Sequence, residues 1–197
     1  MPRFITRGTI LPVFVLTGAL VAAPVRGNDE FAVEKGFASL FNGKDLTGWR
    51  VGQERLDGKT ESADGRFKAR DGVIVIQGAS PIEDLYTVRE FEGDFALRLE
   101  FRASPRANSG LHLRGKQLQV RDYPTIGPYK TLKSFKNGDW NAIEVTVKGN
   151  RAHCTCNGEV LEPALMVPAK GGIGLQSETN QIEYRRIRIN ESQRASD

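Results

Sequence analysis

Three side chains that could carry acid–base chemistry, Glu100, His112 and Arg114, lie in two stretches that alternate apolar and polar residues, 94–104 and 108–114. A carboxylate or an imidazole can remove a proton from carbon, and a guanidinium can stabilise the oxyanion that forms. Side chains alternate between the two faces of a strand. If the odd-numbered leucines and phenylalanines face a core, these three even-numbered groups are expected to emerge together on one polar face.

Further polar groups in the same region suit a hydroxyl-rich ligand. A sugar hydroxyl both donates and accepts a hydrogen bond, and acids, amides and imidazoles meet both needs. The alternative is a solvated sheet face held by cross-strand ion pairs, such as Glu100 with Arg114. The residues expected to contact substrate on this face or at its mouth are Asn108, Ser109, Gln117, Gln119 and Asp122.

Strand-like alternation continues through most of the chain after residue 36. Asn157-Gly158 is a strong hairpin signal, because both residues tolerate positive φ. No window has a sustained 3.6-residue apolar period, so helices should be few and short. The pattern predicts an all-β, antiparallel sandwich or barrel that forms a single domain over residues 37–190.

The cysteines and tryptophans have structural interpretations. Cys154 and Cys156 are two residues apart, a spacing that strains disulfide geometry. We interpret them as small buried apolar residues, because a metal site there would need further ligands. Trp49 and Trp140 could stack on sugars, but their places near strand ends favour packing in the core or at its edge.

Residues 1–27 have the pattern of a secretory signal peptide, with early arginines, an apolar run over 10–23 and small residues before the expected cleavage point. The run is shorter than the roughly 20 residues of a spanning helix; an uncleaved anchor is the alternative. Loss of this segment, which has three arginines and no acid, lowers the formal charge from +4 to +1.

The mature chain then has no basic block of the kind that binds nucleic acid, so no nucleic-acid partner is expected. It also has no expected transmembrane span. We therefore predict an exported protein, either periplasmic or extracellular. The polar face described above would suit a carbohydrate as its partner.

An ordered set of motifs resembles one family. The motifs are LFNGKDLTGW (40–49), EFR (100–102), NSGLHLR (108–114), GDWNAIEVTVKGN (138–150), NGEVL (157–161), GGIGLQ (171–176) and IEYRRIRI (182–189). Together they resemble the 3-keto-disaccharide hydrolase domain of secreted bacterial proteins, also described as a 3-keto-glucoside lyase and hydratase. The resemblance implies a two-sheet jelly-roll sandwich of the concanavalin A-like kind, with Gln176 at a position facing the glycan cleft.

The resemblance also implies an enzyme that cleaves 3-keto-glycosides. The ketone at C3 acidifies the proton at C2, and the enediolate formed by its removal needs a cation or hydrogen-bond donors. As a hypothesis, Glu100 or His112 is the base, and Arg114 or a bound divalent metal stabilises the oxyanion. Gln119 and Asp122 would position the substrate or that metal; the sequence itself defines no metal site.

Two other functions stay open. Gln117 stands where the family usually has a carboxylate, and an amide cannot take a proton, which favours a non-catalytic glycan-binding module on the same scaffold. A structural or envelope interaction domain rests on the fold alone. An ordinary retaining glycosidase is disfavoured, because no strand has the closely spaced carboxylates that such enzymes place around the bond.

Overall fold

The computed structural model describes residues 31–78 and 83–191. The predicted signal peptide, residues 1–27, lies outside the described residues. Within the described ranges the chain is almost entirely antiparallel β structure with one short helix, α1 (Tyr123–Ile126). In those ranges no helix has the length and apolar character needed to cross a membrane.

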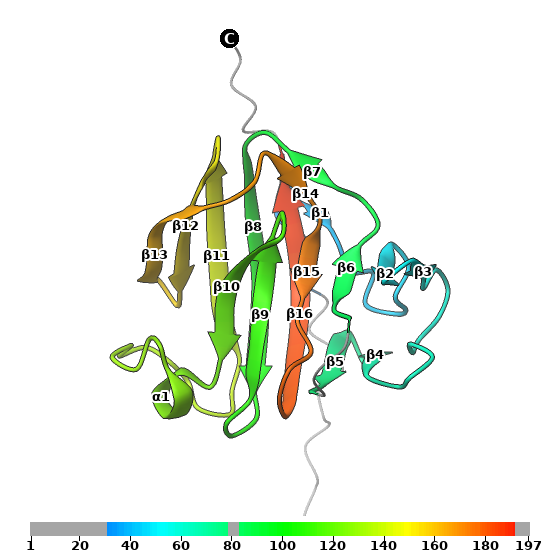
Figure 1. Cartoon of the computed structure of the whole chain (residues 1–197), viewed down its shortest axis with the longest axis horizontal. Helices are drawn as coiled ribbons and strands as arrows, with labels where there is room; N and C mark the ends of the chain where they lie inside the picture. The colour runs from blue at the N-terminus through cyan, green and yellow to red at the C-terminus, as the bar shows by residue number, and fades with distance from the viewer. Residues whose placement is uncertain (1–30, 79–82, 192–197) are drawn as a thin grey trace, which may run out of the picture. The chain divides into compact units, whose positions relative to one another are not determined.

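Two sheets pack face to face, with the smaller one in front of the larger one in Figure 1. Among the described residues the large sheet has the order β13 (Glu159–Met166), β12 (Arg151–Cys156), β11 (Asn141–Lys148), β8 (Phe95–Ala103), β16 (Gln181–Asn190), β5 (Val73–Gln77) and β4 (Phe67–Arg70), and β1 (Ala38–Ser39) pairs with the end of β16. This layout confirms the predicted all-β, antiparallel two-sheet sandwich.

The small sheet carries the polar outer face on which His112 lies. Its order, again among the described residues, is β10 (Lys116–Arg121), β9 (Asn108–Leu113), β15 (Ile173–Leu175), β6 (Leu85–Thr87), β2 (Trp49–Val51) and β3 (Glu54–Arg55). A separate pair joins β14 (Lys170–Gly171) to β7 (Phe91–Glu92).

The core lies between the two sheets and is filled mainly by alternate residues of the longer strands. On β8 the residues Leu97, Leu99 and Phe101 are buried, and on β9 Leu111 and Leu113 are buried opposite them. The alternation predicted from sequence is therefore confirmed for both strands. Burial of such side chains stabilises the fold by about 1.5–3 kcal/mol each.

The cysteines and one tryptophan occupy this core as predicted. Cys154 and Cys156 are free thiols that face inward from β12. Burial raises the pKa of each thiol to about 12, so both stay protonated at neutral pH. Trp49 is fully buried, and its indole N–H donates to the Leu40 carbonyl at 2.8 Å, so it cannot stack on a sugar.

The segment 31–37, here called the N-terminal strap, is held against the outer face of the large sheet. The Glu34 carboxylate accepts hydrogen bonds of 2.5 and 2.6 Å from Arg188 on β16. Arg188 also lies 4.9 Å from the ring centroid of Phe31, and Arg98 lies 4.9 Å from that of Phe37. The strap thus covers the side of the sandwich opposite the small sheet.

The strap makes one prediction about acid stability. The hydrogen bond from Arg188 lowers the pKa of Glu34 from 4.5 to about 2. A carboxyl whose pKa is lower in the folded state stabilises the fold above its unfolded pKa, and that stabilisation is lost as the pH falls through the folded pKa. We therefore expect wild type to unfold at a higher temperature than Glu34→Gln at pH 7, by a margin that shrinks between pH 4.5 and 2.

Thermal unfolding of both proteins across this pH range measures the margin. Because Glu34 is partly exposed and solvent screens the ion pair, the difference should stay below about 1 kcal/mol. A margin that is constant from pH 7 to pH 2 would show that the Glu34 charge does not hold the strap.

Candidate functional site

Glu100 and His112 do not share a face, so the expectation that they emerge together is wrong. Glu100 belongs to β8 in the large sheet, whereas His112 belongs to β9 in the small sheet, and both point away from the core between them. Polar groups on the two strands therefore leave the sandwich on opposite sides. Alternation along a strand determines on which face of its own sheet a side chain lies. It does not determine to which of the two sheets the strand belongs.

Glu100 is held in ion pairs on the outer face of the large sheet. Its carboxylate accepts from Arg185 Nε at 2.7 Å and from Arg186 Nη1 at 2.9 Å. Burial alone would raise its pKa, but these hydrogen bonds hold the pKa of Glu100 below its ordinary value. A carboxylate with both oxygens engaged in this way is a structural group, and the hypothesis that it is the base loses its geometric support.

A bulge in β16 builds this arrangement. The register of β16 against β8 shifts between Arg185 and Arg188, and Arg186 has a φ of 54°, so consecutive arginines face outward. Arg185 lies 4.0 Å and Arg102 4.8 Å from the centroid of Trp140. Trp140, just before β11, thus packs against two guanidinium groups.

Arg114 also departs from the expected polar face. It leaves β9 at the hairpin with a φ of 54°, and its side chain is only 3% exposed. The guanidinium donates to the carbonyl oxygens of Gly149 and Pro168, at 3.2 and 3.3 Å, and to that of Gly93. It therefore ties the β9–β10 hairpin to three other loops, and cannot stabilise an oxyanion beside His112 from this position.

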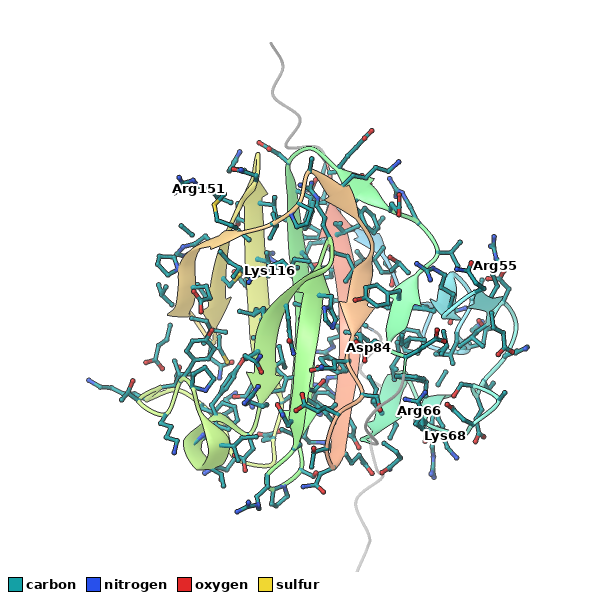
Figure 2. The ribbon with its side chains drawn as sticks, in the orientation of Figure 1. Arg55, Arg66, Lys68, Asp84, Lys116 and Arg151 are labelled. Atoms are coloured by element: carbon teal, nitrogen blue, oxygen red, sulfur yellow. The ribbon has the colours of Figure 1, made fainter. Side chains whose placement is uncertain are left out.

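His112 has an acidic partner that the sequence did not indicate. Its Nε2 lies 3.0 Å from Asp84 Oδ2, and Asp84 Oδ1 accepts the Ser177 backbone N–H at 3.0 Å. An ionised carboxylate only accepts, so Nε2 carries the hydrogen and Nδ1 keeps its lone pair. Nδ1 is buried and has no hydrogen-bond partner. Figure 2 shows Asp84 just before β6, on the side of the small sheet that faces the viewer.

Tyr86 reaches His112 because the residue between them is a glycine. His112 on β9, Gly174 on β15 and Tyr86 on β6 are successive cross-strand partners. A Cβ on Gly174 would lie 2.5 Å from Tyr86 Cε1, so the ring covers the glycine. The Tyr86 and His112 ring centroids are consequently 5.4 Å apart, although two strands in a sheet separated by a third are about 9.6 Å apart.

The amides Gln117 and Gln176 close the other side of His112. Gln117 is the cross-strand partner of His112 and donates from Nε2 to Gln176 Oε1 at 2.6 Å. Its side chain crosses Gly110, where a Cβ would lie 2.4 Å from Gln117 Nε2. The bridge from β10 to Gln176, the residue after β15, thus also depends on a glycine in the intervening strand.

Two more of the expected residues lie further along the same face. Asn108 donates to Glu178, while its Oδ1 is buried and has no partner. Gln119 Oε1 is likewise buried and unpaired. Buried polar atoms are normally hydrogen-bonded, so unpaired acceptors at this face are places where a hydroxyl group would bind favourably.

Ser109 and Asp122 are elsewhere. Ser109 faces the core, where its hydroxyl donates to the Gln176 carbonyl at 2.7 Å and lies 2.9 Å from the Tyr184 hydroxyl. Asp122 is buried and accepts the Arg106 backbone N–H at 2.8 Å. The expectation that these two side chains contact substrate on the face is therefore not supported by where they point.

A pocket of about 460 Å³ opens beside Asp84 and Tyr86. Its lining includes Arg50, Gly52, Glu83, Asp84, Tyr86, Arg114 and Gly172. The sequence had singled out Arg114 as a candidate site residue, but it missed Arg50, Glu83, Asp84 and Tyr86. The alternation of Asp84 and Tyr86 with the buried Leu85 and Thr87 was the available signal, but a three-residue strand is a weak one.

Among the described residues, no group of three or more His, Cys, Asp and Glu side chains could hold a metal ion. Asp84 Oδ2 and His112 Nε2, which lie 3.0 Å apart, are two groups on this face of the kind that bind metals.

Comparison with known proteins identifies a family and a fold. The sequence profile of the 3-keto-alpha-glucoside-1,2-lyase-like domain matches residues 36–190. No curated protein matches the sequence significantly. The chain is similar to two crystal structures of proteins from Parabacteroides distasonis ATCC 8503, each provisionally assigned as a glycosyl hydrolase.

The first of these structures is 20% identical with a TM-score of 0.61, and the match covers 79% of this chain and 94% of that one. The second is 20% identical with a TM-score of 0.54, and the match covers 72% and 98%. Because only 20% of the residues are identical, these two structures support the assignment of the fold alone.

The position of Arg114 leads to a stability prediction. Replacing Arg114 with Met removes a charged donor and leaves three carbonyl groups without it, so the free energy of unfolding should fall by about 2–4 kcal/mol. Lys116→Met, on the same hairpin but exposed, is the control and should change it by less than about 0.5 kcal/mol. Urea denaturation measures both, and equal midpoints for the two variants would contradict the structural role.

Proposed function

The chain belongs to the 3-keto-alpha-glucoside-1,2-lyase-like domain family, and from this premise we propose that it cleaves 3-keto-glycosides on the outer face of the small sheet. The family places it among carbohydrate-active domains. The observation that carries the finer proposal is the Asp84–His112 pair, with Nε2 bound to Asp84 and Nδ1 unpaired.

His112 is the base in this proposal, and Asp84 positions it. The Asp84 carboxylate fixes the tautomer that leaves Nδ1 free to accept a proton, and it stabilises the imidazolium that results. The Ser177 N–H holds the second oxygen of Asp84. The pair is sheltered, with side-chain exposures of 12% for His112 and 17% for Asp84, which strengthens their electrostatic interaction.

The reaction proceeds by elimination. Nδ1 of His112 takes the proton from C2, and the C–H electron pair forms a C2=C3 double bond as the ketone oxygen becomes an oxyanion. That oxyanion then re-forms the ketone, a C1=C2 double bond forms, and the bond from C1 to the leaving oxygen breaks. The imidazolium returns its proton to the leaving oxygen. Addition of water across C1=C2 completes a net hydrolysis.

Neutral donors on the face stabilise the oxyanion in place of Arg114. Burial, with the charge of Asp84, raises the pKa of Tyr86, so its phenol keeps a proton to donate. The Gln176 amide also keeps its N–H groups available, because the Gln117 bond uses Gln176 Oε1. Preorganised donors of this kind are typically worth about 2.7–4 kcal/mol each in the transition state.

Substrate reaches Nδ1 only after a neighbouring side chain turns aside, because Nδ1 is buried. Tyr86 and Gln117 flank the imidazole, and each lies over a glycine of the neighbouring strand. Displacement of the Tyr86 ring by a sugar would expose Nδ1 and bring the phenol to the edge of the ligand.

A non-catalytic glycan-binding module is the second candidate. The paired amides Gln117 and Gln176 favour it, because they offer hydrogen bonds without a titrating group at the place where the family usually has a carboxylate. The two functions differ in one property, since catalysis depends on His112 as a base and binding does not. Export to the periplasm or the cell exterior is part of the proposal and rests on the predicted signal peptide.

His112→Gln tests the proposed base. With a 3-keto-α-glucoside as substrate, we expect kcat to fall by about 10²–10⁴-fold, because Gln cannot accept the C2 proton. Asp84→Asn should also lower kcat, since an amide no longer selects the tautomer. Release of free glycone and leaving group over time measures both effects.

Two variants serve as matched controls. His153→Gln removes the other histidine, which is exposed on β12 of the large sheet, and Glu100→Gln removes the carboxylate on the opposite outer face. Both should leave kcat within about twofold, because neither contacts the small-sheet face. Full activity in His112→Gln would overturn the mechanism, and glycan binding without turnover in wild type would select the binding module.

A further inference from the structure

Unpaired polar atoms continue along the outer face of the small sheet, past His112 and toward α1. In the described part of the chain, six buried side-chain nitrogen and oxygen atoms have no hydrogen-bond partner, and four of them belong to this face. Those four are His112 Nδ1, Asn108 Oδ1, Gln119 Oε1 and Arg121 Nε. Buried polar atoms normally have partners, so a polar ligand along this row would gain hydrogen bonds that the protein alone does not make.

The β9–β10 hairpin gathers three of these residues at its α1 end, and we call them the α1-end site: Asn108, Gln119 and Arg121. Asn108 and Arg121 are direct cross-strand partners, and Gln119 lies two residues before Arg121 on the same face of β10. Side chains in such positions are neighbours. Asn108 and His112 are four residues apart on β9, or about 14 Å along the strand, so a ligand that contacts both must be longer than one sugar ring.

Arg121 has no anionic partner, unlike the arginines on the large sheet. Within residues 31–78 and 83–191 its guanidinium forms no salt bridge and no hydrogen bond. On the large sheet Arg102, Arg185 and Arg188 pair with glutamates at 2.5, 2.7 and 2.5 Å. A partly buried charge without a partner is costly, so an anion would bind favourably beside Arg121.

The groups around Arg121 leave its positive charge uncompensated. Burial raises the pKa of the Tyr129 phenol, and the charge of Arg121 opposes that rise, so the two side chains are close. The Tyr129 hydroxyl donates to Glu162 at 2.6 Å, which engages that carboxylate with the phenol. Lys130 follows Tyr129, is exposed and has no salt bridge in the described ranges, so it adds a second positive charge at this end of the sheet.

Glu178 limits where an anion can bind on this face. Its carboxylate accepts a hydrogen bond from Asn108. Asn108 pairs with Thr179 on one side and with Arg121 on the other, so it separates the negative charge from the positive one. A negative group of a ligand therefore belongs on the β10 side, next to Arg121, with neutral hydroxyl groups toward Asn108.

We propose that the α1-end site binds a carboxylate of the glycan, and that the substrate class is therefore an acidic glycan that contains a uronic acid. The proposal rests on the proposed function, because it assumes that a glycan occupies this face. A planar guanidinium matches a carboxylate, which can accept two parallel hydrogen bonds from it. Hydroxyl groups of the same ligand donate to Asn108 Oδ1 and Gln119 Oε1.

Calorimetry with matched acid and ester ligands tests the proposal. The probes are the unoxidised tetramers of galacturonate, mannuronate and glucuronate, each compared with its methyl ester, which loses the charge and keeps every hydroxyl group. At physiological ionic strength, which screens nonspecific attraction, we expect at least one acid to bind about tenfold or more tightly than its ester. The reason is that only the acid forms a charged hydrogen bond with Arg121.

Arg121→Met should abolish the preference for the acid over the ester. Arg151→Met is the matched control, because it removes the same charge from an exposed position on β12 of the large sheet. Figure 2 shows Arg151 at the end of the sandwich opposite to α1. This control should keep the preference within about twofold, since Arg151 does not contact the small-sheet face.

Three results would overturn the proposal: no acid binds, every acid binds no more tightly than its ester, or the preference for the acid persists in Arg121→Met. The first two are measured on wild type, so they do not depend on the folding of a variant. The probes carry no ketone and need no turnover, so a failure of the His112 mechanism leaves this test intact. Equal binding of acid and ester would conversely leave cleavage of neutral 3-keto-glycosides standing.

Discussion

The alternation of side chains across two sheets packed face to face is the constraint on which this structure depends. The longer strands give alternate residues to one shared core, so their polar residues must lie on the outer face of their own sheet. The sandwich therefore has two polar faces that point away from each other. No rearrangement of side chains can bring Glu100 on β8 to His112 on β9 while their alternate neighbours fill the same core.

The two outer faces differ in whether their charged and polar groups have partners. On the large sheet, arginines are paired with Glu34, Glu100 and Glu183. On the small sheet, by contrast, several buried polar atoms have no partner, including His112 Nδ1 and Gln119 Oε1. A face whose charges are already paired contributes to the fold, whereas unpaired acceptors and donors retain their binding capacity for a ligand.

Local pattern was enough to predict the fold but only part of the site. Apolar period, turn residues and the lack of helical spacing identified the sandwich, and they placed Gln117, Gln119 and His112 on one face because β9 and β10 form a hairpin. Asp84 precedes β6 and is 28 residues from His112 in sequence, so no local pattern links the two. Arg114 was misplaced because the hairpin turn ends the alternation one residue earlier, at Leu113.

Glycines explain how this face acquires its shape. At Gly174 and Gly110 the missing Cβ atoms allow Tyr86 and Gln117 to lie down across a neighbouring strand, and at Gly52 it admits Glu83. Side chains of ordinary size at these positions would stand upright and keep residues two strands apart from meeting. The Asp84–His112 pair would remain, but it would lose its aromatic and amide neighbours. On this face the functional residues can therefore contact one another because glycines, which have no side chain, lie between them.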